Sequence, residues 1–143
     1  MNDQQVTAFH DRIDRLDPDM PPRFGKMNAG QMLCHCADFF RVAKGQRSVS
    51  VARPIAAQEL IRMARAGEPI PTAIGMDQVR GDGTPPTNFA RDRQTLKDLI
   101  SEFAGLPADF AFAAHPYMGK MQRKGWNEMA SFHLDHHLKQ FNV

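Results

Sequence analysis

The residues best suited to chemistry lie near the C-terminus, where residues 132–141 hold three of the chain's six histidines. His133 and His137 are four residues apart, so in a helix they project from one face, a single turn from each other. Trp126 falls on that same face, whereas His136 falls at its edge. Two imidazoles placed in this way can ligate one metal ion.

The same two histidines also fit a structural interpretation. A single histidine on an apolar face is usually a core residue whose hydrogen bonds are satisfied, and two such residues would each need a buried partner. This segment alone therefore leaves both interpretations open, metal ligands and core histidines.

The composition is that of an ordinary globular protein: of 143 residues, 42% are hydrophobic and 24% are charged. It predicts a single domain over residues 1–143, large enough for a real core. The net charge of +2 is too small to indicate nucleic acid or an acidic membrane surface as a partner. Because the sequence shows neither a secretory signal nor an apolar run of about 18 residues, we expect a cytoplasmic protein.

Apolar residues at helical spacing predict four amphipathic helices, at residues 3–16, 28–44, 88–104 and 122–141. Asn28 and Gln31 predict a capping box at the start of the second, and a shorter helix is expected within residues 55–66. No stretch alternates as a strand would. The prediction is an all-α, up-and-down four-helix bundle with a long crossover, residues 45–87, between the second and third of its helices.

The second of these helices supplies a third histidine, because His35 lies at the edge of its apolar face. In one bundle, His35 can converge with His133 and His137. Three histidines leave the fourth position of a tetrahedral ion open, which is the arrangement of catalytic rather than structural sites. Such an ion activates water, polarises a carbonyl or binds a thiolate, and imidazole ligands suit zinc, nickel, iron or copper.

Two cysteines flank His35. In a helix Cys34 and Cys36 project to roughly opposite sides, so they cannot form a disulfide with each other. Cys34 is expected to point outward and Cys36 inward, as a small apolar filler of the core. Neither is therefore a good candidate for a nucleophile.

A short repeat precedes both histidine-bearing helices, with Gly-Lys-Met at residues 25–27 and again at residues 119–121. The repeat suggests that the two helices are entered in the same way and run parallel. In an up-and-down bundle the second and fourth helices are parallel across a diagonal. We therefore expect that relation between helices 28–44 and 122–141.

Taken together, residues 25–27, residues 31–36 (Gln-Met-Leu-Cys-His-Cys) and the histidine-rich residues 133–141 resemble the DinB-like (YfiT-like) metalloenzyme superfamily. More narrowly, they resemble a bacterial branch described only as a domain of unknown function. The likeness covers most of the chain, although Phe24 stands where this branch is expected to have tryptophan. The superfamily pattern, one histidine in the second helix and an H-x3-H pair in the fourth, corresponds to His35, His133 and His137.

The resemblance implies a four-helix bundle, often dimeric, with a divalent metal in a pocket. Some relatives use low-molecular-weight thiols as co-substrates in transferase or isomerisation chemistry. Two classes of function remain open for this chain. One is a metal-dependent enzyme, such as a thiol-dependent transferase or a hydrolase, acting on a small molecule. The other is a non-enzymatic bundle that binds a metal ion or a small ligand.

Three further residues are expected near the metal. Asp38 and Gln140 each follow a histidine by three residues, a spacing at which a side chain can lean toward its neighbour and accept an N–H from it. Arg93 falls on the inner face of its helix, where it could bind an anionic group of a substrate, unless its stem packs while its charged end reaches solvent. The open metal position is expected to face a cleft covered by residues 45–87 and 105–121.

Overall fold

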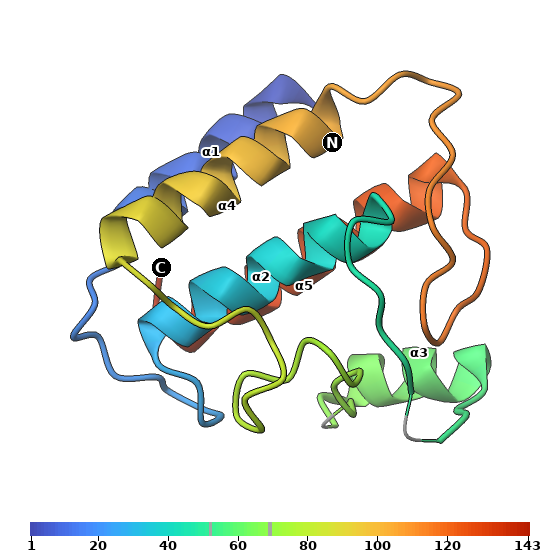
Figure 1. Ribbon diagram of the computed structural model, residues 1–143, viewed down its shortest axis with the longest axis horizontal. Coiled ribbons are helices and arrows are strands. Elements are labelled where there is room, and N and C mark those ends of the chain that lie inside the picture. The colour runs from blue at the N-terminus through green and yellow to red at the C-terminus, as the bar shows by residue number, and fades with distance from the viewer. Residues whose placement is uncertain (52, 69) are drawn as a thin grey trace.

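The computed structural model describes residues 1–51, 53–68 and 70–143, and within them the secondary structure is helical apart from two isolated β-bridges. Five helices follow one another along the chain (Figure 1): α1 (Asp3–Asp14), α2 (Ala29–Ala43), α3 (Ala57–Ala66), α4 (Phe89–Ala104) and α5 (Arg123–Gln140). The all-α prediction is confirmed, and all five helices lie where the sequence predicted them. None of the helices in these ranges is long and apolar enough to cross a membrane.

Asparagine side chains begin three of the helices. Asn2, Asn28 and Asn88 each accept a hydrogen bond from the backbone N–H three residues later, which satisfies a donor that the helix itself leaves free. At α1 and α2 the glutamine at that position accepts a hydrogen bond in turn from the backbone N–H of the N-cap asparagine, so the capping box predicted from Asn28 and Gln31 is present. Because of such caps, the starts of these helices can be predicted from the sequence.

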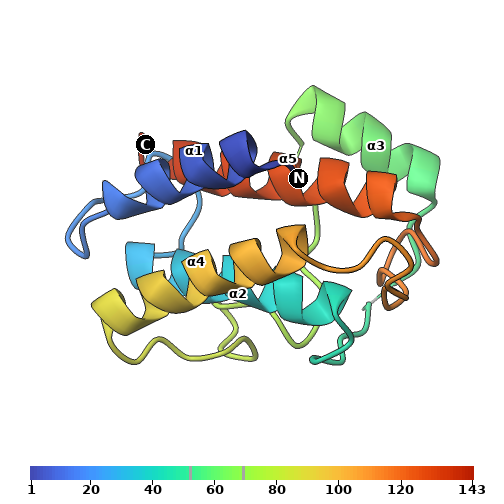
Figure 2. The ribbon, with the colours of Figure 1, turned by 90° about the horizontal axis from the view of Figure 1, so that it is seen from above.

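The four long helices form two layers, with α1 beside α5 and α2 beside α4, as Figure 2 shows. α2 also contacts α5, and α1 also contacts α4, so each helix has two neighbours. α2 and α4 run in the same direction, and Lys44 pairs with Glu102 at their C-terminal ends. α1 and α5 run the opposite way (Figure 1), joined by the Arg12–Asp135 ion pair at 3.0 Å.

The expected parallel, diagonal relation between α2 and α5 is wrong, because the two helices are antiparallel neighbours. The amide of Arg23, just before α2, donates to the carbonyl of Gln140 at the end of α5 (2.7 Å). At the other end of the bundle, Phe39 of α2 packs on Trp126 of α5, with ring centroids 5.7 Å apart. The two Gly-Lys-Met turns therefore lie at opposite ends of the bundle.

The helices do not alternate strictly up and down, because α4 runs in the same direction as α2, and the crossover explains why. A short loop would have forced α4 to run antiparallel to α2, whereas residues 45–87 are numerous enough to return to the end of the bundle where α2 began. α4 therefore starts beside the start of α2. The pyrrolidine ring of Pro86, near the end of the crossover, lies close to Gly30 in the first turn of α2.

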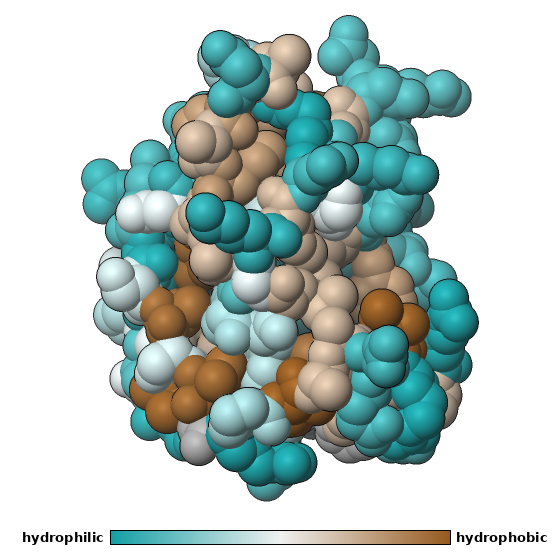
Figure 3. All heavy atoms as spheres, turned by 90° about the vertical axis from the view of Figure 1, so that its right-hand side faces the viewer, coloured by the Kyte–Doolittle hydropathy of each residue, from teal (hydrophilic) through white to brown (hydrophobic). Residues whose placement is uncertain are grey.

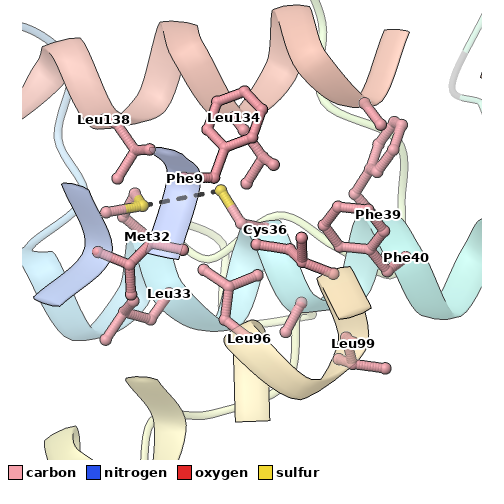
Figure 4. Close-up of a cluster of buried hydrophobic side chains, with 14 of the residues drawn as sticks. Phe9, Met32, Leu33, Cys36, Phe39, Phe40, Leu96, Leu99, Leu134 and Leu138 are labelled. Atoms are coloured by element: carbon pink, nitrogen blue, oxygen red, sulfur yellow. Dashed lines mark hydrogen bonds between the residues drawn. The ribbon is translucent and has the colours of Figure 1, made fainter. Parts of the chain in front are cut away.

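α2 is the central helix, and every residue from Met32 to Phe40 is buried. One side packs on α4 and another on α5; the cluster of side chains between them is drawn in Figure 4, where the Cys36 thiol lies 3.7 Å from the Met32 sulfur. Cys36 is thus a core residue, as predicted. Cys34 was predicted to point outward, and that is wrong, because the crossover covers the third side of α2 and leaves Cys34 only 4% exposed.

The crossover also carries α3, which lies at one end of the molecule beside the four-helix core (Figures 1 and 2). Seen from that end, apolar side chains remain exposed between hydrophilic ones (Figure 3). The loop 105–121 closes over the same region. The amide of Ala113 donates to the carbonyl of Ala43 at the end of α2 (3.0 Å), and the Tyr117 hydroxyl donates to the carbonyl of Pro71 (3.1 Å).

Candidate metal centre

Three imidazoles converge where α2 passes α5. The ring centroid of His35 lies 4.9 Å from that of His133 and 4.7 Å from that of His137, and the latter two are 4.6 Å apart. One ring nitrogen from each histidine lies within 4.8 Å of the others, so the group could hold a metal ion. The one-turn spacing on α5 and its direct contact with α2 bring together the three residues that the sequence singled out.

Hydrogen bonds define which nitrogen of two of these rings is available. His35 Nδ1 lies 2.9 Å from the carbonyl oxygen of Met76, and because a carbonyl only accepts, Nδ1 carries the proton. His137 Nδ1 lies 3.2 Å from Gln140 Oε1. The Gln140 amide is oriented in turn, since its Nε2 donates to the carbonyl of Phe24 at 2.6 Å. Both histidines therefore present an unprotonated Nε2 for ligation.

The third ring is the one with an unsatisfied nitrogen. His133 Nε2 is buried and has no hydrogen-bond partner among the described residues, while the ring itself stacks on Phe39 at a centroid distance of 4.7 Å. Leaving a buried polar atom unpaired costs about 1–3 kcal/mol. Coordination of an ion would remove that cost, and three imidazole nitrogens are a donor set that suits zinc, nickel or iron. The residues present therefore fit a divalent metal ion.

Burial lowers the pKa of all three histidines below the ordinary value of 6.5. For His137 the pKa falls to about 3, first through burial and then through the neighbouring His35. The pKa of His133 is lowered well below 6.5, again by burial first and then by the other two rings. The imidazoles are neutral at pH 7, which is the form that binds metals.

Comparison with known families places the chain. A family profile described as "Protein of unknown function (DUF1569)" matches residues 3–143. The chain belongs to this family. Searches of curated proteins and of solved structures gave no significant match. The three clustered histidines all lie within the matched region of this DUF1569 protein.

Of the three other residues expected near the metal, one contacts a histidine of the centre and two have their partners elsewhere. Gln140 lies beside His137, as described above. Asp38 instead directs its carboxylate at Thr84, accepting from its backbone N–H (2.8 Å) and from its hydroxyl (2.6 Å). Arg93 reaches the carbonyl oxygen of Asp14 at the end of α1 (3.4 Å), and its guanidinium lies over the ring of Phe89, so the structure places it on the α1–α4 side of the bundle.

Sequence reasoning missed the group that bonds His35. The acceptor is the main-chain carbonyl of Met76, 41 positions along the chain and within the crossover. Every residue carries such a carbonyl, so no residue type marked this one. The carbonyl of Phe24, which orients Gln140, escaped prediction for the same reason.

The surface beside the centre is aromatic. His136, one residue before a predicted ligand, is exposed and lies between Phe24 and Phe132, with ring centroids 5.2 Å and 6.3 Å away. Two surface hollows of the described chain lie elsewhere. One is lined by residues at the C-terminal ends of α2 and α4, including Lys44 and Glu102. The other is lined by residues of the loop between α1 and α2 and by the two residues that follow α5. The cleft expected over the open metal position therefore stays a prediction.

Proposed function

We propose that this DUF1569 protein binds one divalent metal ion through the Nε2 atoms of His35, His133 and His137, and that it is a metal-dependent enzyme. The observation that carries the proposal is the buried Nε2 of His133, which has no hydrogen-bond partner among the described residues. Its ring lies 4.9 Å from that of His35 and 4.6 Å from that of His137, both neutral imidazoles whose protons are fixed on Nδ1. A purely structural histidine would have a partner for that atom. The three-residue ligand set leaves room for a substrate group on the ion.

We further propose that the reaction is a transfer or a hydrolysis on a small molecule. A zinc, nickel or iron ion in this position would supply a Lewis acid able to activate water, a thiol or a carbonyl. The protein would keep the three imidazoles neutral and oriented toward the ion. Phe39 and the crossover would exclude water from one side of the ion. The likeness to the DinB-like superfamily supports a low-molecular-weight thiol as co-substrate and a homodimer as the assembly.

The second candidate is a non-enzymatic bundle that binds a metal ion or a small ligand. One observation favours it: neither of the two surface hollows is lined by a residue of the centre. Turnover separates the candidates. Metal-loaded protein should act on at least one member of a panel of thiol–electrophile pairs and simple esters and amides, and His133→Ala should lose that activity. Equal activity in the two proteins, or none across the panel, would leave binding alone.

Metal content tests the site itself. Protein purified without nickel resin should contain about one ion per chain by elemental analysis. His137→Ala should lose it with little change in helix content by circular dichroism. His136→Ala is the matched control on the adjacent position and should keep the ion, because its ring lies at the exposed edge. Loss of metal in His136→Ala and retention in His137→Ala would show that the ligand set is misassigned.

A further inference from the structure

The hydrogen bond that fixes His35 comes from a distant loop, so something must hold that loop in place. We call residues 75–84 the anchor loop. Its backbone folds on Asp77, whose carbonyl accepts from the amides of Gly81 and Asp82 (both 3.1 Å) and whose own amide donates to the Asp82 carboxylate (2.7 Å). The loop therefore has a defined shape, and Met76 lies just before its turn, buried against α2.

Arg47 ties the two ends of the anchor loop together. Its Nε donates to the carbonyl of Gly75, the residue directly before Met76. Its two terminal nitrogens donate to the Thr84 hydroxyl (3.0 Å) and to the carbonyl of Asp82 (2.9 Å). Three donors in the fixed plane of one guanidinium thus determine the positions of three separate points of the loop.

Asp38 ties the loop to the helix that carries His35. Its side chain is fully buried and accepts from the amide and the hydroxyl of Thr84, and Arg41 contributes an ion pair at 2.9 Å. A buried carboxylate is stable only when its oxygens are satisfied in this way. Since Asp38 follows His35 by three residues in one rigid helix, the contact with Thr84 fixes the position of the anchor loop relative to His35.

We propose that Arg47, Asp38 and Thr84 form a positioning clamp for the metal centre. The clamp holds the Met76 carbonyl on His35 Nδ1, which keeps the proton on that nitrogen and aims Nε2 at His133 and His137. This inference rests on the proposed metal site. It differs from a merely structural role, in which the clamp would close the crossover without influencing the state of the His35 ring.

The test uses full-length protein with Arg47→Met, and with Arg80→Met as the matched control. Arg80 lies in the same anchor loop and pairs with Asp77 on the exposed side, 2.8 Å away, so its loss removes an arginine without touching the clamp. Two quantities are measured: the tautomer of His35 in metal-free protein, by long-range ¹H–¹⁵N NMR, and the affinity for Zn²⁺, by competition with a chelator. Unfolding in urea monitors stability separately.

In the wild type and in Arg80→Met, His35 should be a single Nδ1–H tautomer. In Arg47→Met, it should become a mixture of tautomers, and the affinity for Zn²⁺ should fall about 10–100-fold. Thr84→Val removes only the hydroxyl from the clamp, so it replaces Arg47→Met if that variant does not fold. A folded clamp variant with the wild-type tautomer and the wild-type affinity would overturn the proposal. If the wild type binds no Zn²⁺, the metal site is wrong, and the tautomer alone decides whether the clamp positions His35.

Discussion

Metal-free protein should lose stability when the pH falls from 7 to 5.5. Burial lowers the pKa of His35, His133 and His137 in the folded state below 6.5, the ordinary value that the unfolded chain keeps. Between the folded and unfolded pKa values the unfolded state binds more protons, so protonation favours unfolding. The stability that the neutral imidazoles allow is complete above pH 6.5 and is lost progressively as the pH falls below it.

The size of the effect follows from the linkage relation. A histidine that stays neutral in the folded state loses about 1.3 kcal/mol of stability over this interval, so His133 and His137, whose pKa values lie far below 6.5, together lose about 2.5 kcal/mol. His35 and His115, whose pKa values burial also lowers, add losses of the same sign. The total is a large part of the 5–15 kcal/mol that is typical of a folded domain. Acidic groups titrate mainly below this range, so the histidines dominate the change.

Urea unfolding at the two pH values, in the presence of a chelator, measures the change directly. His133→Leu removes one of the three groups and should reduce the loss by about 1.3 kcal/mol. Met129→Leu, on the same helix, alters no titratable group and should retain the wild-type loss. A wild-type change below about 1 kcal/mol would refute the conclusion that three neutral imidazoles are buried together.

Three further predictions rest on single contacts. Gln140→Leu leaves the buried Nδ1–H of His137 without its acceptor. It should therefore destabilise the protein by about 1–3 kcal/mol and weaken Zn²⁺ binding about 10–100-fold. Gln94→Leu, at an exposed position, should have neither effect. Cys34 and Cys36 should resist iodoacetamide at pH 8 until urea unfolds the chain, because burial raises the pKa of both thiols, that of Cys34 to about 12. Gly25→Ala should cost about 1–2 kcal/mol in thermal unfolding, because the residue has a φ of +77° and a new Cβ would lie 2.5 Å from Gln140 Nε2.

The sequence predicted the helices and the histidine trio because both depend on local information. Apolar spacing and the Asn28 cap locate α2, and the four-residue spacing of His133 and His137 places both on one face of α5. Helix direction was not predictable in this way. It depends on how residues 45–87 travel in space, and a segment of that length permits either direction.

Burial around α2 shows the same limit. The helical wheel correctly assigned Cys36 to the core, but it assigned Cys34 to the surface because that side of the helix is less apolar than the others. In the structure the crossover covers this side with polar groups, and Thr84 and Arg41 satisfy the carboxylate of Asp38 there. A buried side that is lined by satisfied polar contacts cannot be distinguished from a solvated side by hydrophobicity alone.

The geometry of the centre depends on chain segments that contain no ligand. His35 is oriented by the crossover through the Met76 carbonyl, and His137 is oriented through Gln140 by the Phe24 carbonyl, which lies before α2. His133 Nε2, by contrast, is buried without a hydrogen-bond partner among the residues that the structure describes. Two rings are thus set by the fold before any ion binds, and the third would be completed by the ion itself. Because an ion held in this way binds only the folded chain, it stabilises the fold by about 2.7 kcal/mol at a free concentration one hundred times its dissociation constant. That stabilisation acts on the crossover and on the segment before α2 as well as on the helices, since both segments supply the acceptors that the ligands need.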